Sequence, residues 1–149
     1  MWNDNKSLVL SKICVIVFIV LLITAAILTP SVVSRLTDIS SNARQAGAGL
    51  FLATIYIGSV PAAALLVSMY MLLRRISAGD VFVKENVSSL RFISWCFFVG
   101  AVIGTASAFY FIAWLPIGIA AAFMCLVVRV VKNVIAKAVS LQDDADFTI

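Results

Sequence analysis

Charge is scarce in this chain. Asp, Glu, Lys and Arg make up 12% of its 149 residues, against about 25% in a soluble domain, and hydrophobic residues make up 63%. A soluble globular protein is therefore excluded, because it would expose far more apolar surface than a water-soluble fold carries. Histidine is absent altogether, which removes the usual haem ligand and the commonest metal ligand.

Cysteine pairs are also lacking. Cys14, Cys96 and Cys125 are far apart, and each lies within an apolar run, so none has the spacing of a redox motif or a zinc site. We interpret all three as small buried hydrophobic side chains. No glycine-rich phosphate loop, Ser-His-Asp set or carboxylate pair can be assembled either. The sequence therefore predicts no cofactor and a protein that is not an enzyme.

What the chain does contain is four long apolar runs, and a membrane-spanning helix needs about 20 such residues. They predict spans at about 13–29, 50–73, 92–112 and 114–131. The predicted fold is all-α, an integral membrane four-helix bundle. Lys6 and Lys12 before the first run also fit a signal peptide, but the run is longer than the usual apolar core of about 7 to 15 residues. We interpret it as an uncleaved span.

Lys and Arg residues predict the orientation. Nine of the eleven lie in segments that share the side of the N-terminus, and only Arg35 and Arg44 lie on the other side. The positive-inside rule then places the N- and C-termini in the cytoplasm, and we expect a multi-pass protein of the bacterial cytoplasmic (inner) membrane. Residues 76–91 are predicted to form a cytoplasmic connector helix, and residues 132–149 a cytoplasmic helix extension and tail.

On the outer side, an interfacial helix is predicted within residues 30–49, because apolar residues recur there at helical spacing. Its predicted apolar face consists of Val32, Leu36, Ile39 and Ala43.

The predicted spans have no ionisable side chain in their interiors, where such groups mark proton or substrate pathways. A small four-helix multidrug exporter has a similar size but needs an intramembrane carboxylate, so this reading is disfavoured. Small residues recur four apart in the third and fourth spans. These residues, Gly100, Gly104, Gly118 and Ala122, predict close helix packing, either within the monomer or at a homodimer seam.

The connector presents Val83, Val87 and Leu90 at helical spacing, with Lys84, Glu85, Ser88 and Arg91 on its polar side. This surface would either anchor to anionic lipid or contact a protein. The acids Asp143, Asp144 and Asp146 indicate a solvated acidic end rather than a metal site. We expect this tail to reach the connector, with Phe147 and Ile149 packing against Phe82, Val83 or Val87, so that both form one cytoplasmic platform.

Two short segments carry a family resemblance: GDVFVKENVSSLRFISW, residues 79–95, and DADFTI, residues 144–149. They resemble DUF2975, a bacterial membrane family of unknown function. The resemblance implies four helices and no named activity, and it makes a helix-turn-helix regulator encoded beside the gene a candidate partner. Val83 departs from the Thr or Ser that could cap the helix in the family, and Ser94 from a common Gly. The matching pattern residues are Phe82, Glu85, Asn86, Val87, Leu90, Arg91, Ile93, Asp146, Thr148 and Ile149.

Together these features predict a non-enzymatic membrane protein, a protein-interaction or regulatory subunit whose cytoplasmic platform binds a cytosolic regulator or a membrane-complex partner. The lipid bilayer is its expected surrounding, a homodimer stays open, and no direct nucleic-acid binding is expected. The predicted contact residues are Phe82, Glu85, Asn86, Leu90, Arg91, Asp146, Phe147 and Ile149.

The alternative is a small-ligand or peptide binder or carrier, such as a resistance or immunity factor. Its predicted cleft is aromatic and is lined by Tyr56, Tyr70, Trp95, Phe109 and Tyr110.

Overall fold

A computed structural model describes residues 4–148, with side chains for residues 5–146. Its helices are α1 (Asp4–Ile39), α2 (Ser41–Ala46), α3 (Ala48–Ser77), α4 (Lys84–Ser107), the short 3-10 helix η1 (Ile112–Trp114) and α5 (Leu115–Thr148). No strand occurs in this part of the chain, so the predicted all-α class is confirmed. The four long helices α1, α3, α4 and α5 are each long and apolar enough to cross a membrane.

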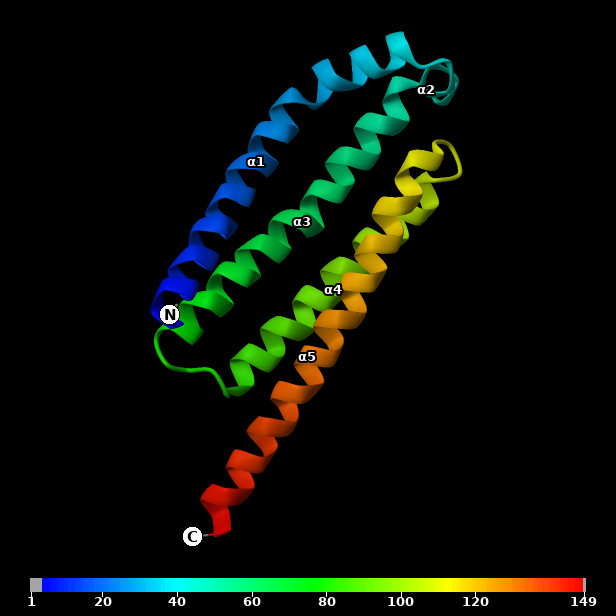
Figure 1. The fold of residues 1–149 in the computed structure, drawn as a ribbon. Helices are drawn as coiled ribbons and strands as arrows, with labels where there is room; N and C mark the ends of the chain where they lie inside the picture. The colour runs from blue at the N-terminus through cyan, green and yellow to red at the C-terminus, as the bar shows by residue number, and fades with distance from the viewer. Residues whose placement is uncertain (1–3, 149) are drawn as a thin grey trace.

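The four long helices form an open row rather than a closed bundle (Figure 1). Contacts join α1 to α3, α3 to α4 and α4 to α5. Within residues 4–148, α1 and α5 share no pair of Cα atoms within 8 Å. One side of the row is therefore left open between its two outer helices.

Pro30 does not end the first helix, although the sequence placed the end of the first span there. Pro30 has no N–H to donate to the carbonyl of Ala26, one turn earlier in α1. The hydroxyl of Tyr56 on α3 donates to that carbonyl at 3.2 Å instead. Because a neighbouring helix satisfies the freed backbone oxygen, α1 continues to Ile39 and bends towards α2 in its second half (Figure 1).

One cluster of buried residues lies at the end of the row where α1 meets α2. Val33, Ala43 and Phe51 are buried together, and Tyr110 and Phe111 pack edge-on against Phe51 at ring distances of 5.2 and 5.1 Å. This packing draws residues 108–114 back over α3, and α4 ends at Ser107, earlier than predicted.

The helical face predicted for residues 30–49 is wrong in part. Val32 and Ile39 are exposed, and Val33 is buried in their place. The reason is that Val33 and Leu36 pack in one cluster with Phe51 of α3, so the buried face of α1 is turned away from the predicted one.

The closest approach in the fold lies between α4 and α5. A Cβ atom built on Gly104 would stand 2.8 Å from both Cα and N of Gly118. Gly100, one turn away, is opposite Ala121. A Cβ atom built on Gly100 would lie 4.0 Å from the Cβ of Ala121. Ala122, which the four-residue spacing singled out, is exposed instead, because the packing row on α5 advances by three residues from Gly118.

The end of α5 is helical where the sequence predicted a helix extension followed by a tail. The helix continues unbroken through residues 132–148 and projects past the start of α4 (Figure 1). After Gly118 the chain has neither glycine nor proline to interrupt it. The predicted connector helix also differs: residues 76–77 finish α3, residues 78–83 form a turn, and residues 84–91 are the first turns of α4.

Candidate functional site

The turn between α3 and α4 is fixed by Asn86, a side chain with only 1% of its surface exposed. Its Nδ2 donates to the carbonyl oxygens of Asp80 at 2.7 Å and of Val81 at 2.9 Å. Gly79 allows the turn, with a φ of +96° that side chains of L-residues rarely adopt. Asn86 thus holds the start of α4 against the turn that precedes it.

Arg75 ties the end of α3 to α4. Its guanidinium donates to Ser89 Oγ at 2.7 Å and to the carbonyl oxygen of Glu85 at 3.4 Å. The Arg75 side chain is therefore engaged by hydrogen bonds within the protein. The bond orients the polar side of α4, on which Lys84, Glu85, Ser88 and Arg91 are all exposed.

A groove of about 460 Å³ lies between this part of α4 and the projecting end of α5. Its floor is apolar, with Val87 from α4 and the buried Val139 from α5. Cations stand on the α4 side and acids on the α5 side of the same groove. The lining residues are Lys84, Val87, Ser88, Arg91, Ala136, Val139, Ser140, Asp143 and Asp144. We call this feature the α4–α5 groove.

The comparisons with known proteins bear on this region. A family profile matches residues 7–149 and carries the description "Protein of unknown function (DUF2975)". The chain belongs to this family. The predicted resemblance is thus confirmed, over nearly the whole of the DUF2975 chain. No match was found among curated proteins or among solved structures.

Several pattern residues of this DUF2975 chain serve its own packing. Leu90 and Ile93 are buried together with Asn86, because α5 covers that face of α4. The sequence placed Asn86 and Leu90 on a contact surface, whereas the structure places both inside. Val83 is the N-cap of α4 and makes no capping hydrogen bond through its side chain, as its departure from Thr or Ser implied. Ser94 lies at the contact with α5, with its Oγ 3.5 Å from Cys125 Sγ.

The other predicted contact residues are spread over two places. Phe82 and Glu85 are exposed near the turn, and Arg91 lines the α4–α5 groove. Asp146 is exposed near the end of α5. The backbone of Phe147 belongs to α5, but its side chain and the whole of Ile149 lie outside the described residues. The described end of α5 stays helical and does not turn back towards α4. The residues of α5 that line the groove with α4 lie earlier, between Ala136 and Asp144.

Sequence reasoning missed an unpartnered apolar face on α5. Val134 is 63% exposed and Leu141 57% exposed, and both lie beyond Arg129, after which the chain becomes charged. Val127 and Val131 precede them on the same face and are also exposed. The signal was present in the sequence as a spacing of four, three and then seven residues, which keeps one face of a helix in line. We call Val127, Val131, Val134 and Leu141 the α5 stripe.

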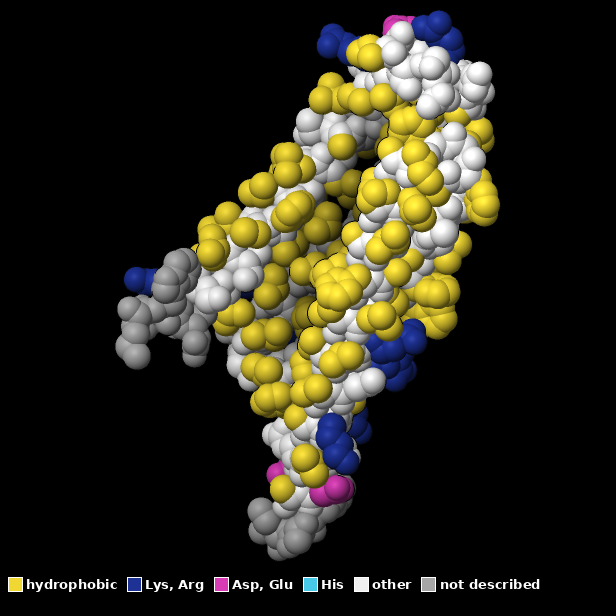
Figure 2. Space-filling model, turned by 45° about the vertical axis from the view of Figure 1, so that its right-hand side comes forward, with side chains coloured by type: hydrophobic (Ala, Val, Ile, Leu, Met, Phe, Trp, Pro, Cys, Tyr) yellow, Lys and Arg dark blue, Asp and Glu magenta, His cyan; other side chains and the backbone are white. Residues whose placement is uncertain are grey.

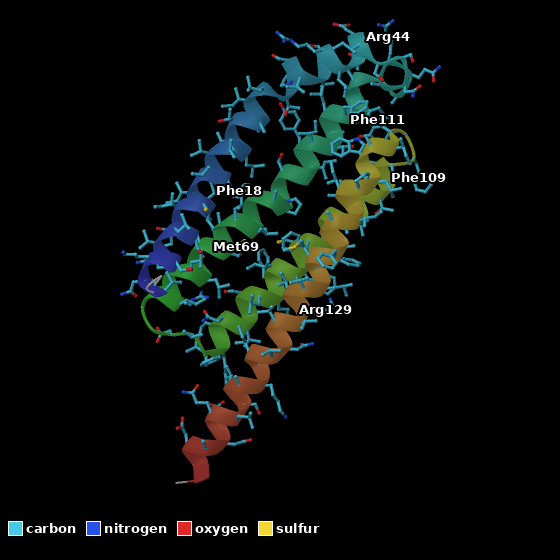
Figure 3. All side chains as sticks on the ribbon, viewed as in Figure 1. Phe18, Arg44, Met69, Phe109, Phe111 and Arg129 are labelled. Carbon is cyan, nitrogen blue, oxygen red and sulfur yellow. The ribbon has the colours of Figure 1, made fainter. Side chains whose placement is uncertain are left out.

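The aromatic cleft predicted for the alternative function is not formed. Trp95 is exposed on α4 and packs edge-on with Phe98, while Phe109 is 94% exposed and points away from the helices (Figure 3). Tyr56 bonds to α1, and Tyr110 joins the cluster around Phe51. These side chains diverge because they lie on different faces and at different levels of the row.

An apolar hollow does exist elsewhere, on the open side of the row (Figure 2). Cavities of about 350 and 620 Å³ adjoin one another there, and each is lined by residues from α1, α3, α4 and α5. Phe18 of α1 and Met69 of α3, on two neighbouring helices, both line the larger cavity (Figure 3). We call the two cavities together the lateral groove.

Proposed function

We propose that this DUF2975 protein is a multi-pass protein of the bacterial cytoplasmic membrane with both termini in the cytoplasm. Hydrophobic side chains form a broad band on the molecule, and Lys and Arg side chains stand towards its ends (Figure 2). Such a band suits a hydrocarbon layer of about 30 Å. The excess of basic residues at the end of α3, at the start of α4 and in the middle of α5 supports the orientation.

Its proposed role is non-enzymatic: it docks a cytosolic partner protein at the membrane. The observation that carries this proposal is that α5 continues past the start of α4 with an exposed apolar face. In the proposed orientation, Val134 and Leu141 lie on the cytoplasmic side of Arg129 and Lys132, where exposure to water is unfavourable for apolar side chains. Each large apolar side chain that becomes buried contributes about 1.5 to 3 kcal/mol.

The partner segment that fits is an amphipathic helix laid along α5. Its apolar side would cover Val134 and Leu141, the part of the α5 stripe beyond the predicted span, and its acidic residues would face the exposed Lys137, one turn before Leu141. The charges set the direction and register of docking more than its strength. A small helix-turn-helix regulator, the partner class that the family resemblance implies, has helices of suitable length.

Thiol labelling tests the orientation. In a variant without the three native cysteines, Ser41→Cys should react with a membrane-impermeant maleimide on intact cells, because α2 would lie outside. Ser77→Cys should react only after the membrane is opened. Both positions are exposed in the structure, so accessibility within the fold does not bias the comparison. Labelling in the opposite pattern would overturn the orientation, and labelling of both sites on intact cells would contradict membrane insertion.

Site-specific crosslinking tests the docking role. A photo-crosslinking residue in place of Leu141 should give one adduct with a cytosolic protein, and Val134→Asp should reduce this adduct at least about tenfold, which corresponds to about 1.4 kcal/mol. Asn133→Asp is the matched control, since it adds the same charge at the neighbouring exposed position. An adduct that survives Val134→Asp, or one with the mass of two copies of this chain, would contradict the proposal.

A further inference from the structure

The lateral groove runs along most of the membrane-spanning length. Its lining on α3 extends from Thr54 to Leu73, which is about 28 Å at about 1.5 Å per residue. The floor is formed by α3 and α4, and α1 and α5 form the two walls. Gly58, Gly100 and Gly104 line its outer part and leave space there beside the side chains of the other lining residues of α3 and α4, which are Thr54, Ile55, Ser59 and Ile103.

The lining offers an occupant almost nothing except apolar contact. In the larger cavity the side chains are Leu, Val, Phe and Met, together with Cys14 and Ser11. The hydroxyl of Ser11 already donates to the carbonyl oxygen of Ser7 at 3.0 Å. In the smaller cavity, Ser59 donates to Ile55 O at 2.6 Å, and Thr54 accepts a bond from Tyr110 at 2.7 Å. A peptide would leave its backbone polar groups unsatisfied there, so the occupant is a hydrocarbon chain.

Size favours a single chain over another helix. A spanning helix about 30 Å long and about 10 Å across fills roughly 2,400 Å³. The cavities of about 620 and 350 Å³ are much smaller and lie in the range of small-ligand sites. Their volumes therefore suit an acyl chain better than a second helix.

Cations stand at one mouth of the groove. Lys12 follows the lining residue Ser11 on α1, and Arg74 follows the lining residue Leu73 on α3. Both basic residues lie at the end where α1 begins and α3 ends (Figure 1). A lipid whose chain occupies the larger cavity would have its phosphate at this end. The negative phosphate would then lie near the two positive charges of Lys12 and Arg74.

We infer that the lateral groove binds one anionic phospholipid, with an acyl chain between α1 and α5 and the phosphate beside Lys12 and Arg74. The lipid chain supplies the packing that α1 and α5 do not give each other. The inference rests on the proposed membrane insertion but is independent of docking at the α5 stripe. The lateral groove also offers a binding site for the alternative function, a small-ligand binder, whose predicted aromatic cleft is not formed.

Native mass spectrometry tests the inference. The protein is reconstituted with vesicles of phosphatidylglycerol and phosphatidylcholine in equal amounts and is then released in mild detergent. We expect one phosphatidylglycerol on each chain. In Gly58→Leu/Cys14→Phe, which fills both cavities, retention should fall at least about tenfold. A Cβ at Gly58 meets no heavy atom within 4 Å, and Cys14 is exposed, so both new side chains have space.

Gly49→Leu/Val17→Phe is the control, because it introduces the same two side chains at exposed positions outside the groove. This control should keep the lipid. Lys12→Gln/Arg74→Gln should remove the preference for phosphatidylglycerol over phosphatidylcholine while a lipid is still retained.

Equal retention by the filled variant and its control would overturn the inference, as would a lipid-free dimer of the unmodified chain, in which a second copy occupies the groove. Melting of the filled variant at or above the temperature of its control would show that loss of lipid is not loss of fold. Thiol labelling at residues 41 and 77 stays as the separate check on membrane insertion, so its failure is distinguishable from failure of lipid binding.

Discussion

Gly104→Ala is expected to destabilise the protein, whereas Gly100→Ala, one turn earlier on the same helix, is expected to leave it unchanged or more stable. The Cβ added at Gly104 would lie 2.8 Å from two backbone atoms of Gly118 and 3.5 Å from the carbonyl oxygen of Trp114. Backbone atoms cannot move aside as a flexible side chain can, so α4 and α5 must separate. Overpacking of this kind costs about 1 to 3 kcal/mol.

At Gly100 the same methyl group would meet only Ala121 Cβ, at 4.0 Å. Both substitutions gain about 1 kcal/mol of helix propensity, so the difference between the two variants isolates the clash. Thermal melting in detergent measures it, at about 2 to 4 °C for each kcal/mol in a chain of this size. Gly104→Leu should separate the two helices further and lower the melting temperature more. Equal melting of the two alanine variants would show that the close approach does not stabilise the fold.

The close approach of Gly104 and Gly118 also shows how far small-residue spacing predicts packing. Spacing of four residues identified both glycines, because backbones can approach only where side chains are smallest. It did not identify the rest of the row on α5, where Ala121 and Cys125 face α4 and Ala122 does not. Whether a packing row advances by three or four residues depends on how the helices cross, which sequence alone does not contain.

The helix ends, like the packing row, could be predicted only in part from the sequence. The four apolar runs predicted four long helices, because a run of this length needs its backbone hydrogen bonds satisfied within the segment. Pro30 predicted an end that α1 does not have, since the compensating donor, Tyr56, comes from a distant part of the chain. Phe51 likewise shortens α4 by drawing in aromatic residues across the row. Long-range contacts of this kind override local signals.

The candidate site was predicted in part. The sequence brought the first turns of α4 and the acidic end of α5 to the same region, and the structure lines one groove with residues of both, including Arg91 and Asp143. The polar side of α4 followed from helical spacing. The inward position of Asn86 did not, because asparagine is mostly a surface residue, and only the fold of the preceding turn reveals the two carbonyl oxygens that it bonds.

Asn86→Leu is therefore expected to weaken the isolated protein in the absence of any partner. Leucine fills a similar volume but removes both donors, so the carbonyl oxygens of Asp80 and Val81 lose their side-chain partner in the turn. The loss of two hydrogen bonds costs about 1 to 3 kcal/mol in total, at about 0.5 to 1.5 kcal/mol each. Hydrogen exchange of the amides in residues 78–83 should become faster, and melting in detergent should occur at a lower temperature. Ser88→Ala, at an exposed position one turn into the same helix, is the control and should change stability by less than about 0.5 kcal/mol.

Asn86→Asp separates hydrogen bonding from packing. The carboxylate keeps the shape of the side chain but directs a negative charge at two carbonyl oxygens in a site that is 1% exposed. A buried charge without a partner costs about 3 to 5 kcal/mol, so this variant should be less stable than Asn86→Leu. If Asn86 served a partner surface instead, both variants would have the melting temperature of the unmodified protein, and only partner binding would change. That result would return this residue of the DUF2975 pattern to an interaction role. The expected order of melting temperatures, with Asp lowest, Leu between and Asn highest, assigns it to the turn.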